Sequence, residues 1–298
     1  MSVYTARGLS LSTDPRDREF RREGLPVERK GGLRAKFAVG LGIGRDFFFE
    51  VPETISDARE QGWIREERPA NQHLPTLQLY CANPTVLCVL YEPDTENAAG
   101  LQIGVNRDRF TGAPFDFAVQ GWTEWISSSG VAYWTIAEYF VDEAYLEIDA
   151  QERIANRNSN SILQLDGIWV TGFNKEIYKI PGSSSDIEAA GFTKQLCMPW
   201  MGQHYYYNIT KESECSAESI FPWFPLYDHG RLIGMGMNVF GHLERIDGER
   251  DWFEAPGRRG VEVIVNNGPQ CLYDLAESAD ILTMHTYFVA KPQLVLCI

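Results

Sequence analysis

Short apolar runs separated by turn-forming residues are the main pattern along this chain. In the first half they predict strands at residues 76–81, 85–91, 101–105, 132–140 and 145–148. In the second half they predict strands at residues 162–170, 204–209, 223–227, 232–240, 261–265, 282–289 and 294–297. Few long helical patterns lie between these runs. The pattern therefore predicts a mainly β protein with antiparallel sheets, built as a sandwich or a barrel.

The two halves of the chain resemble each other. Residues 48–63 and 177–192 each contain an apolar run that ends at a proline, a Ser-Asp pair, and a glycine followed by an aromatic residue. Four further matches follow in the same order: Gln72-His73 with Gln203-His204, 90–92 with 226–228, 104–106 with 236–238, and 139–141 with 287–289. Chance similarity among β-rich segments is the alternative, but the constant order favours two tandem copies of one β-rich domain.

Each copy is expected to contain one short helix after its first strand. Ser56 or Asp57 in the first copy, and Ser185 or Asp186 in the second, can accept hydrogen bonds from the free N–H groups of that helix. The helices are followed by glycines, Gly62 and Gly191, which suit a left-handed C-terminal cap. Residues 228–230 are predicted to form a hairpin turn, in which Gly230 adopts a positive φ.

The domain boundaries follow from changes in composition. Residues 1–32 are charged, lack periodicity and are interpreted as an N-terminal arm. Residues 33–155 form the first β-rich repeat and 156–298 the second, because the polar segment 156–161 is turn-prone.

Charge and cysteine content restrict the partners and the compartment. The 298-residue chain has a net charge of −14, which disfavours nucleic acid and anionic membrane surfaces as partners. No apolar stretch is long enough to span a bilayer. The six cysteines form no C-x-x-C pair, and free thiols in a cytoplasmic protein are favoured over three disulfides. A secreted mature form remains the alternative, and the oligomeric state is left open.

No cofactor or metal motif is present in the sequence. Residues 40–44 read Gly-Leu-Gly-Ile-Gly, but the next residues resemble a strand and not the helix that a dinucleotide-binding loop requires. We interpret this segment as a glycine-rich hairpin. The histidines have no metal-ligand spacing, although His204, His242 and His285 could converge in the folded chain. We therefore expect no cofactor and no metal.

An aromatic segment at residues 198–208 is the strongest candidate for a functional site. On a strand, His204 and Tyr206 share one face while Tyr205 and Tyr207 share the other. An imidazole beside a phenol suits general acid/base catalysis near neutral pH. The same residues also fit a ligand pocket or an ordinary tyrosine-rich strand.

These residues define the candidate catalytic and binding sets. The candidate catalytic residues are His204, Tyr206, Asp228 and Glu254. The candidate substrate-binding residues are Trp200, Tyr205, Tyr207, Trp223 and His285, although His285 also fits an ordinary sheet position.

The first hypothesis is a cofactor-independent isomerase, cyclase or lyase that acts on an apolar or aromatic small molecule. His204 and a nearby tyrosine or carboxylate would move the proton. The alternative is a non-catalytic protein that binds small molecules or glycans, with an exposed tryptophan stacked on the ligand.

Overall fold

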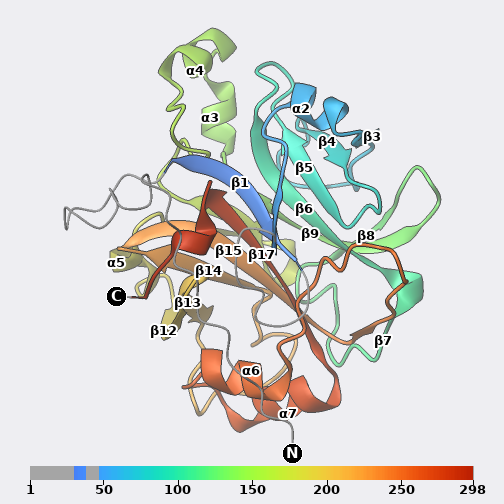
Figure 1. The fold of residues 1–298 in the computed structure, drawn as a ribbon, viewed down its shortest axis with the longest axis vertical. Coiled ribbons are helices and arrows are strands. Elements are labelled where there is room, and N and C mark those ends of the chain that lie inside the picture. Colours follow the sequence, from blue (N-terminus) through green and yellow to red (C-terminus); the bar gives the residue numbers. More distant parts are fainter. Residues whose placement is uncertain (1–29, 38–46, 298) are drawn as a thin grey trace, which may run out of the picture.

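The computed structural model describes residues 30–37 and 47–297. Within them the chain forms two large antiparallel sheets that pack against each other (Figure 1). The mainly β, antiparallel fold is confirmed. Neither large sheet closes on itself within the described ranges, so the arrangement is a two-layer one and not a barrel.

Strand order defines the two layers. The seven-stranded sheet has the order β12 (Phe192–Met198), β13 (Gly202–Tyr207), β14 (Trp223–Asp228), β15 (Arg231–Phe240), β17 (Ile281–Val289), β1 (Gly31–Lys36) and β2 (Phe48–Glu50). The eight-stranded sheet has the order β11 (Ile177–Ile180), β10 (Ile168–Thr171), β9 (Ala132–Tyr139), β6 (Ala98–Asn106), β5 (Leu87–Tyr91), β4 (Gln78–Cys81) and β3 (Ile64–Glu66), and β8 (Thr123–Ile126) also pairs with β9. A small sheet pairs β7 (Phe110–Thr111) with β16 (His242–Leu243).

Each large sheet takes two strands from the opposite half of the chain. The first two strands, β1 and β2, extend the seven-stranded sheet, whose other strands all come from the second half. Strands β10 and β11 likewise extend the sheet that is built from the first half. The strand orders of the two sheets therefore match when each sheet is read from one edge. The eight-stranded sheet reads β3-β4-β5-β6-β9-β10-β11, and the seven-stranded sheet reads β12-β13-β14-β15-β17-β1-β2.

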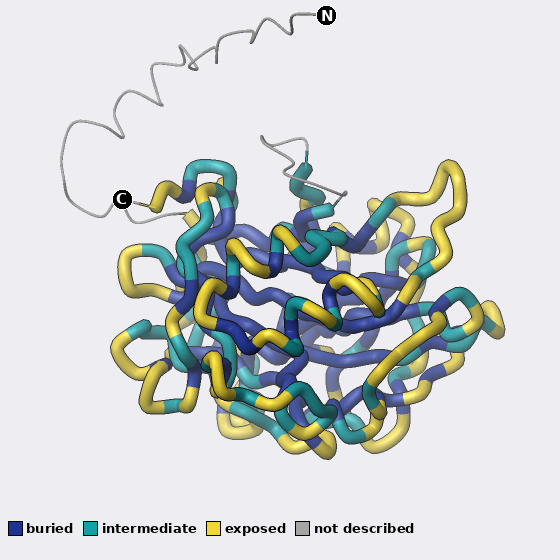
Figure 2. Tube along the Cα trace, turned by 90° about the horizontal axis from the view of Figure 1, so that it is seen from below, coloured by how far each residue is buried: buried dark blue, intermediate teal, exposed yellow. Residues whose placement is uncertain are grey.

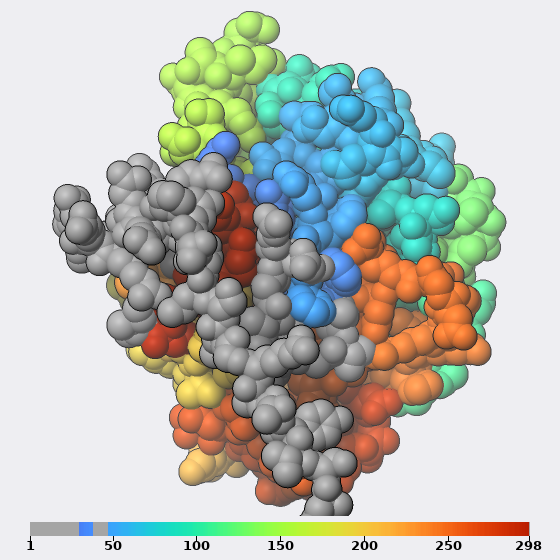
Figure 3. All heavy atoms as spheres, in the orientation of Figure 1, coloured from blue at the N-terminus to red at the C-terminus, as the bar shows by residue number. Residues whose placement is uncertain are grey.

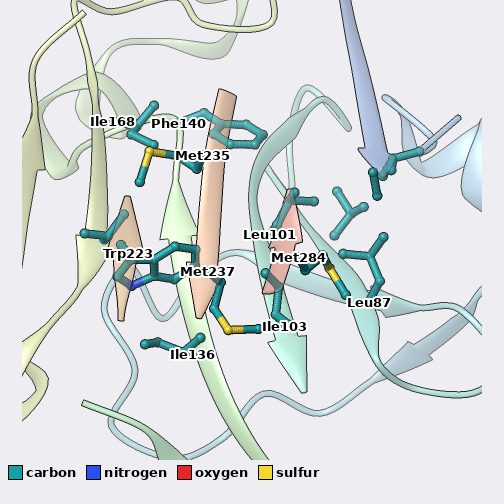
Figure 4. Packing of buried hydrophobic residues seen from close by; sticks show 14 of the residues in the cluster. Leu87, Leu101, Ile103, Ile136, Phe140, Ile168, Trp223, Met235, Met237 and Met284 are labelled. Carbon is teal, nitrogen blue, oxygen red and sulfur yellow. The ribbon is translucent and has the colours of Figure 1, made fainter. Parts of the chain in front are cut away.

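The main hydrophobic core lies between the two sheets. Figure 4 shows Leu101 and Ile103 from one sheet facing Met235, Met237 and Met284 from the other. Removal of these side chains from water is the main driving force for packing the layers together. Figure 2 shows the same division, with buried strands inside and exposed residues in the peripheral loops.

One carboxyl group lies inside this core. Glu138 on β9 accepts a hydrogen bond of 2.9 Å from the hydroxyl of Thr286 on β17, which joins the centres of the two sheets. Burial raises the pKa of Glu138 to about 8, so the carboxyl group is mainly protonated at neutral pH.

The helices are more numerous than the sequence predicts. They are α2 (Ile55–Glu60), α3 (Glu143–Glu147), α4 (Ala150–Asn156), α5 (Ser184–Ile187), α6 (Gly257–Ile264) and α7 (Gln270–Ser278), with short 3-10 turns at η2 (Arg107–Arg109), η3 (Phe173–Lys175) and η4 (Pro292–Leu294). One short helix per half is therefore wrong. The predicted strands at 145–148, 261–265 and 294–297 are also wrong, because α3, α6 and η4 occupy or overlap those segments.

Local interactions explain these differences. The carboxylate of Asp142 accepts a hydrogen bond from the backbone N–H of Tyr145, which caps α3. In α6 the alternating valines suggest a strand, but Val261 and Val265 lie one helical turn apart and are buried, whereas Val263 is exposed. Short apolar runs do not distinguish a buried strand from a buried helix face.

The two predicted helix starts are displaced, while the turns are confirmed. Thr54 caps α2 and Ser183 caps α5, upstream of the residues we expected. The cap is a Ser or Thr hydroxyl in both helices, so the chemistry is as expected and only the position differs. The predicted turn glycines Gly62, Gly191 and Gly230 all have positive φ.

Two of the sequence matches between the halves do not correspond in the sheets. Gln203-His204 lies within β13, whereas Gln72-His73 precedes β4. In the ladders, Tyr139 is opposite Gly100 and Tyr287 is opposite Gly234. The match of 104–106 with 236–238 is therefore displaced by two residues relative to this pairing.

All six cysteines are paired in disulfides: Cys81–Cys88, Cys197–Cys297 and Cys215–Cys271. The prediction of free thiols is wrong. Disulfides persist in oxidising compartments, so they favour such a compartment over the cytoplasm. None of the described helices is long and apolar enough to cross a membrane.

The structure describes only part of the chain around β1. Gly31 and Gly32, assigned to the arm by sequence, belong to β1. The predicted glycine-rich hairpin at 40–44 lies outside the described residues.

Candidate functional site

A cavity of about 360 Å³ lies beside the outer face of the seven-stranded sheet, the face directed away from the other sheet. Helix α6 forms much of the opposite wall, and Figures 1 and 3 show α6 and α7 together at one end of the molecule. The lining is mainly apolar and includes Met201, Ile209, Phe240, Val261 and Leu272. Its size and character are those of a small-molecule site.

The register of the strands determines which residues form the sheet wall of the cavity. Phe224 is opposite Gly236, Gly236 is opposite His285, and His285 is opposite Lys36. These four positions form one row across β14, β15, β17 and β1. A Cβ atom at Gly236 would overlap the ring of Phe224, so only glycine lets this ring lie over the sheet.

Glu254 joins the row from a loop. Strand β1 ends at Lys36, and Glu254 then forms an isolated antiparallel bridge with Thr283 of β17, with two backbone hydrogen bonds. Nearby, the guanidinium of Arg250 lies 4.4 Å from the ring centroid of Phe37 and 5.1 Å from that of Trp252. These contacts hold the loop against β1, which keeps the carboxylate of Glu254 at the cavity.

Lys36, Glu254 and His285 form a buried charged cluster. One carboxylate oxygen of Glu254 accepts a hydrogen bond from the Lys36 ammonium, and the other accepts from Nδ1 of His285. Burial by itself would raise the pKa of Glu254, but His285 and Lys36 outweigh it and lower that pKa. The carboxylate of Glu254 therefore bridges the Lys36 ammonium and the His285 imidazole.

This arrangement defines the tautomer of His285. Because Nδ1 donates to the carboxylate, Nε2 of the neutral ring carries a lone pair. Nε2 is buried and has no hydrogen-bond partner among the described residues. A carboxylate that orients an imidazole in this way is the arrangement found in general-base catalysis.

His204 supplies a second imidazole at the same cavity. Its Nδ1 lies 3.0 Å from the carbonyl oxygen of Gly202 and donates to it, so its buried Nε2 is also unpaired within the described chain. Burial first, and then His285, lower the pKa of His204 to about 3, against smaller opposing effects of the Gly202 and Leu196 carbonyls and Glu254. His204 is therefore neutral at physiological pH.

The ring of Phe224 contacts both imidazoles and the phenol of Tyr206. The rings of His204 and His285 are 6.0 Å apart, and Phe224 lies 5.7 Å from the first and 5.3 Å from the second. Tyr206 stacks on Phe224 at 4.8 Å. Burial raises the pKa of Tyr206 well above its usual value, so its phenol remains a proton donor.

The cavity contains five of the nine residues singled out by sequence. They are His204, Tyr206, Tyr207, Glu254 and His285. His204 and Tyr206 share a face as expected, but their rings are 6.4 Å apart and the contact is one of stacking. The carboxylate that pairs with an imidazole is Glu254, and the imidazole is that of His285.

The other four residues lie elsewhere. Asp228 lies at the hairpin end of β14, opposite Arg231. Trp200 lies in the turn between β12 and β13, Tyr205 packs on Tyr227, and Trp223 is buried and donates to the carbonyl of Thr171. None of the four lines the cavity.

Sequence reasoning did not identify Lys36 or Arg259. Lys36 lies between the apolar residues Ala35 and Phe37, and a charge within an apolar strand was the available signal. Arg259 lies two residues before the strand predicted at 261–265, so its place on a helix at the cavity had no sequence signal.

The described residues contain no cluster of three or more metal-binding side chains. His242 does not join the two cavity histidines, because it is exposed and pairs with Asp280 at 3.1 Å. A comparison with protein-family models finds no match, and searches of curated proteins and of solved structures find none either.

Proposed function

We propose that this protein is an enzyme that moves a proton on an apolar small molecule, as an isomerase, cyclase or lyase does. His285 acts as the general base through Nε2, and Glu254 orients it through Nδ1. Lys36 neutralises the carboxylate and holds it in place. Tyr206 remains protonated and can donate to an oxygen of the substrate.

The pairing of a carboxylate with an imidazole inside an apolar cavity carries this proposal. Buried polar atoms are normally paired, because an unpaired one loses its hydrogen bonds to water without compensation. His204 and His285 nevertheless each have a buried Nε2 with no partner in the described chain. Two such acceptors on one cavity wall support a site that receives a proton donor.

The apolar lining favours the same chemistry. A cavity that excludes water strengthens electrostatic interactions and keeps a base unsolvated. Positioning a substrate beside the two imidazoles would also reduce the entropic cost of proton transfer.

A small aromatic carbon acid tests this base without knowledge of the natural substrate. We would use 5-nitrobenzisoxazole, which loses its ring C–H proton to a base while the N–O bond breaks, giving a coloured cyanonitrophenolate. The wild-type protein should show saturable turnover, with the proton passing from His285 to solvent. His285→Ala should reduce kcat by about 100-fold or more.

Two further variants separate the roles of the residues. Glu254→Gln should lower kcat with little change in KM, because it disturbs the orientation of the base and not the apolar surface. His73→Ala is the matched control, since His73 lies against the other sheet and packs on Tyr139. Turnover that is equal in wild type and His285→Ala would refute the proposed base.

A non-catalytic binding protein is the alternative function. Saturable binding of the probe without turnover would support it, and a molecule retained in a native mass spectrum would identify the ligand class. Half-buried Trp200 and buried Trp223 are both absent from the cavity lining, which gives no support to a glycan stacked on these rings.

We also propose that the two sheets arose by duplication, with the site kept on the seven-stranded sheet. The matching strand orders and the hairpins contributed by the opposite halves support this. Glu138 and Thr286, each one residue before the matched tyrosine, meet between the sheets, as expected for two related halves around an approximate twofold axis.

A further inference from the structure

Arg259 differs from its neighbour Arg258 in one important respect. Arg258 is bound by three carboxylates, those of Glu262, Asp274 and Glu277, each at 2.8 Å. Arg259 lines the cavity, is exposed, and has no ionic partner among the described residues. Its guanidinium is therefore free to bind a group that the protein does not supply.

The charges around the cavity leave Arg259 uncompensated. Glu254 is neutralised by Lys36, and His204 is neutral. Of the charged side chains that line the described part of the cavity, only Arg259 has no counter-charge. Although the chain has a net charge of −14, Arg259 is a local cation at the cavity that can attract an anion.

The start of α6 adds to this positive charge. Pro256 occupies the capping position and makes no side-chain hydrogen bond to the helix, so the first N–H groups have no cap. Pro256 and Gly260 line the cavity together with Arg259, which places this helix start beside it. Free N–H groups and the helix dipole both favour a negative group at this position.

We infer that the substrate is an apolar organic acid. Its apolar body occupies the cavity beside the imidazoles, and its anionic head, a carboxylate or an acidic enol, binds Arg259 and the start of α6. The inference rests on the proposed function for the site. The two unpaired imidazole nitrogens independently indicate that a ligand belongs in the cavity.

A pair of ligands that differ only in charge tests the inference. We would measure the binding of naphthalene-2-carboxylate and naphthalene-2-carboxamide by calorimetry. Because the guanidinium is exposed, its preference for the carboxylate should be modest, about 3- to 10-fold at low salt. The preference should decline as salt is added.

Substitutions at Arg259 test whether this residue causes the preference for the carboxylate. Arg259→Gln should abolish it and leave the affinity for the carboxamide unchanged, whereas Arg259→Lys should retain part of it. Arg65→Gln is the matched control, because Arg65 is an exposed arginine at the edge of the other sheet. This control should keep the full preference, and unchanged melting temperatures should show that all three variants fold.

The outcomes distinguish this inference from the proposed function. Equal affinity for both ligands, or an unchanged preference in Arg259→Gln, overturns the organic acid as substrate. The proposed base would still stand if His285→Ala lowers turnover of 5-nitrobenzisoxazole. Binding of neither ligand, with no turnover of that probe, overturns both.

Discussion

The outer faces of the two sheets are built at matching positions but closed differently. On the eight-stranded sheet, Cys88, Gln102 and Ala137 lie side by side on β5, β6 and β9. On the seven-stranded sheet, the corresponding row on β14, β15 and β17 is Phe224, Gly236 and His285.

A hydrophobic cluster covers one face, and helices α6 and α7 cover the other around a cavity. Leu79, Leu90 and Tyr139 belong to a hydrophobic cluster over the first face. Over the second, α6 and α7 pack around Val261 and Leu272 and leave the cavity. The difference indicates that sheet architecture alone does not locate a site. On the second face a cavity coincides with two imidazole Nε2 atoms, of His204 and His285, that have no partner within the described chain.

Removal of the buried carboxylate of Glu254 should have the largest effect on the free energy of unfolding. Glu254→Gln leaves the Lys36 ammonium buried without its counter-charge, and we expect a loss of about 3–5 kcal/mol in the free energy of unfolding. Lys36→Met combined with Glu254→Gln should recover much of it. Gln102→Leu, on the other face, should be neutral or stabilising, because Nε2 of Gln102 is buried without a partner in the described chain. Denaturant unfolding measures all three, and equal losses would contradict the comparison.

The disulfides on the two faces should contribute unequally to the free energy of unfolding. Cys215–Cys271 connects α7 to the chain after β13 and closes a loop with a sequence separation of 56, whereas Cys81–Cys88 has a separation of 7. Chain entropy in the unfolded state predicts that replacing the first pair with serine costs about 4 kcal/mol and the second about 2–3 kcal/mol. Thermal unfolding of the two double variants would show the order, and its reversal would argue against this account.

Adding one methyl group at Gly236, beneath Phe224, should lower the free energy of unfolding. Gly236→Ala forces the Phe224 ring away from the sheet and into the cavity, with an expected loss of about 1–3 kcal/mol and weaker probe binding. Gly104→Ala on the other sheet is the milder control, because its nearest contact would be the Thr85 carbonyl oxygen at 3.1 Å. Equal melting temperatures for these variants would show that Phe224 is free to move.

The smallest effect that we expect is a pH dependence from His204. Its folded-state pKa of about 3 lies below the usual unfolded value of about 6.5. Between these values the unfolded state binds the proton more strongly, so stability falls as the pH falls, by about 1.4 kcal/mol at pH 5.5. His204→Phe should remove this part of the slope. Burial also lowers the pKa of His73, but that residue is only partly buried, and His73→Ala should change the slope less. Equal slopes for His204→Phe and wild type would contradict the assignment.

The strands could be predicted because their signal is local. Alternation of side chains, β-branched residues and turn glycines identified β5, β9, β14, β15 and β17 to within a few residues. The errors fall on short apolar segments such as that of α6, where capping and packing against α7 decide between strand and helix.

The candidate site was only partly visible in the sequence. His204 and Tyr206 were identified because two aromatic residues at a spacing of two share a strand face. The pairing of Glu254 with His285 has no local signal, since the residues are 31 positions apart and meet through an isolated bridge.

The sequence by itself determined the mainly β character, the turns and the histidine strand, because each depends on interactions between neighbouring residues. Tertiary structure decided that β1 joins the sheet of the opposite half, which places Lys36 218 residues away from its partner Glu254. It also decided that α6 covers an outer face, which places Arg259 at a cavity. These outcomes depend on which surfaces exclude water together, and no short stretch of sequence contains that information.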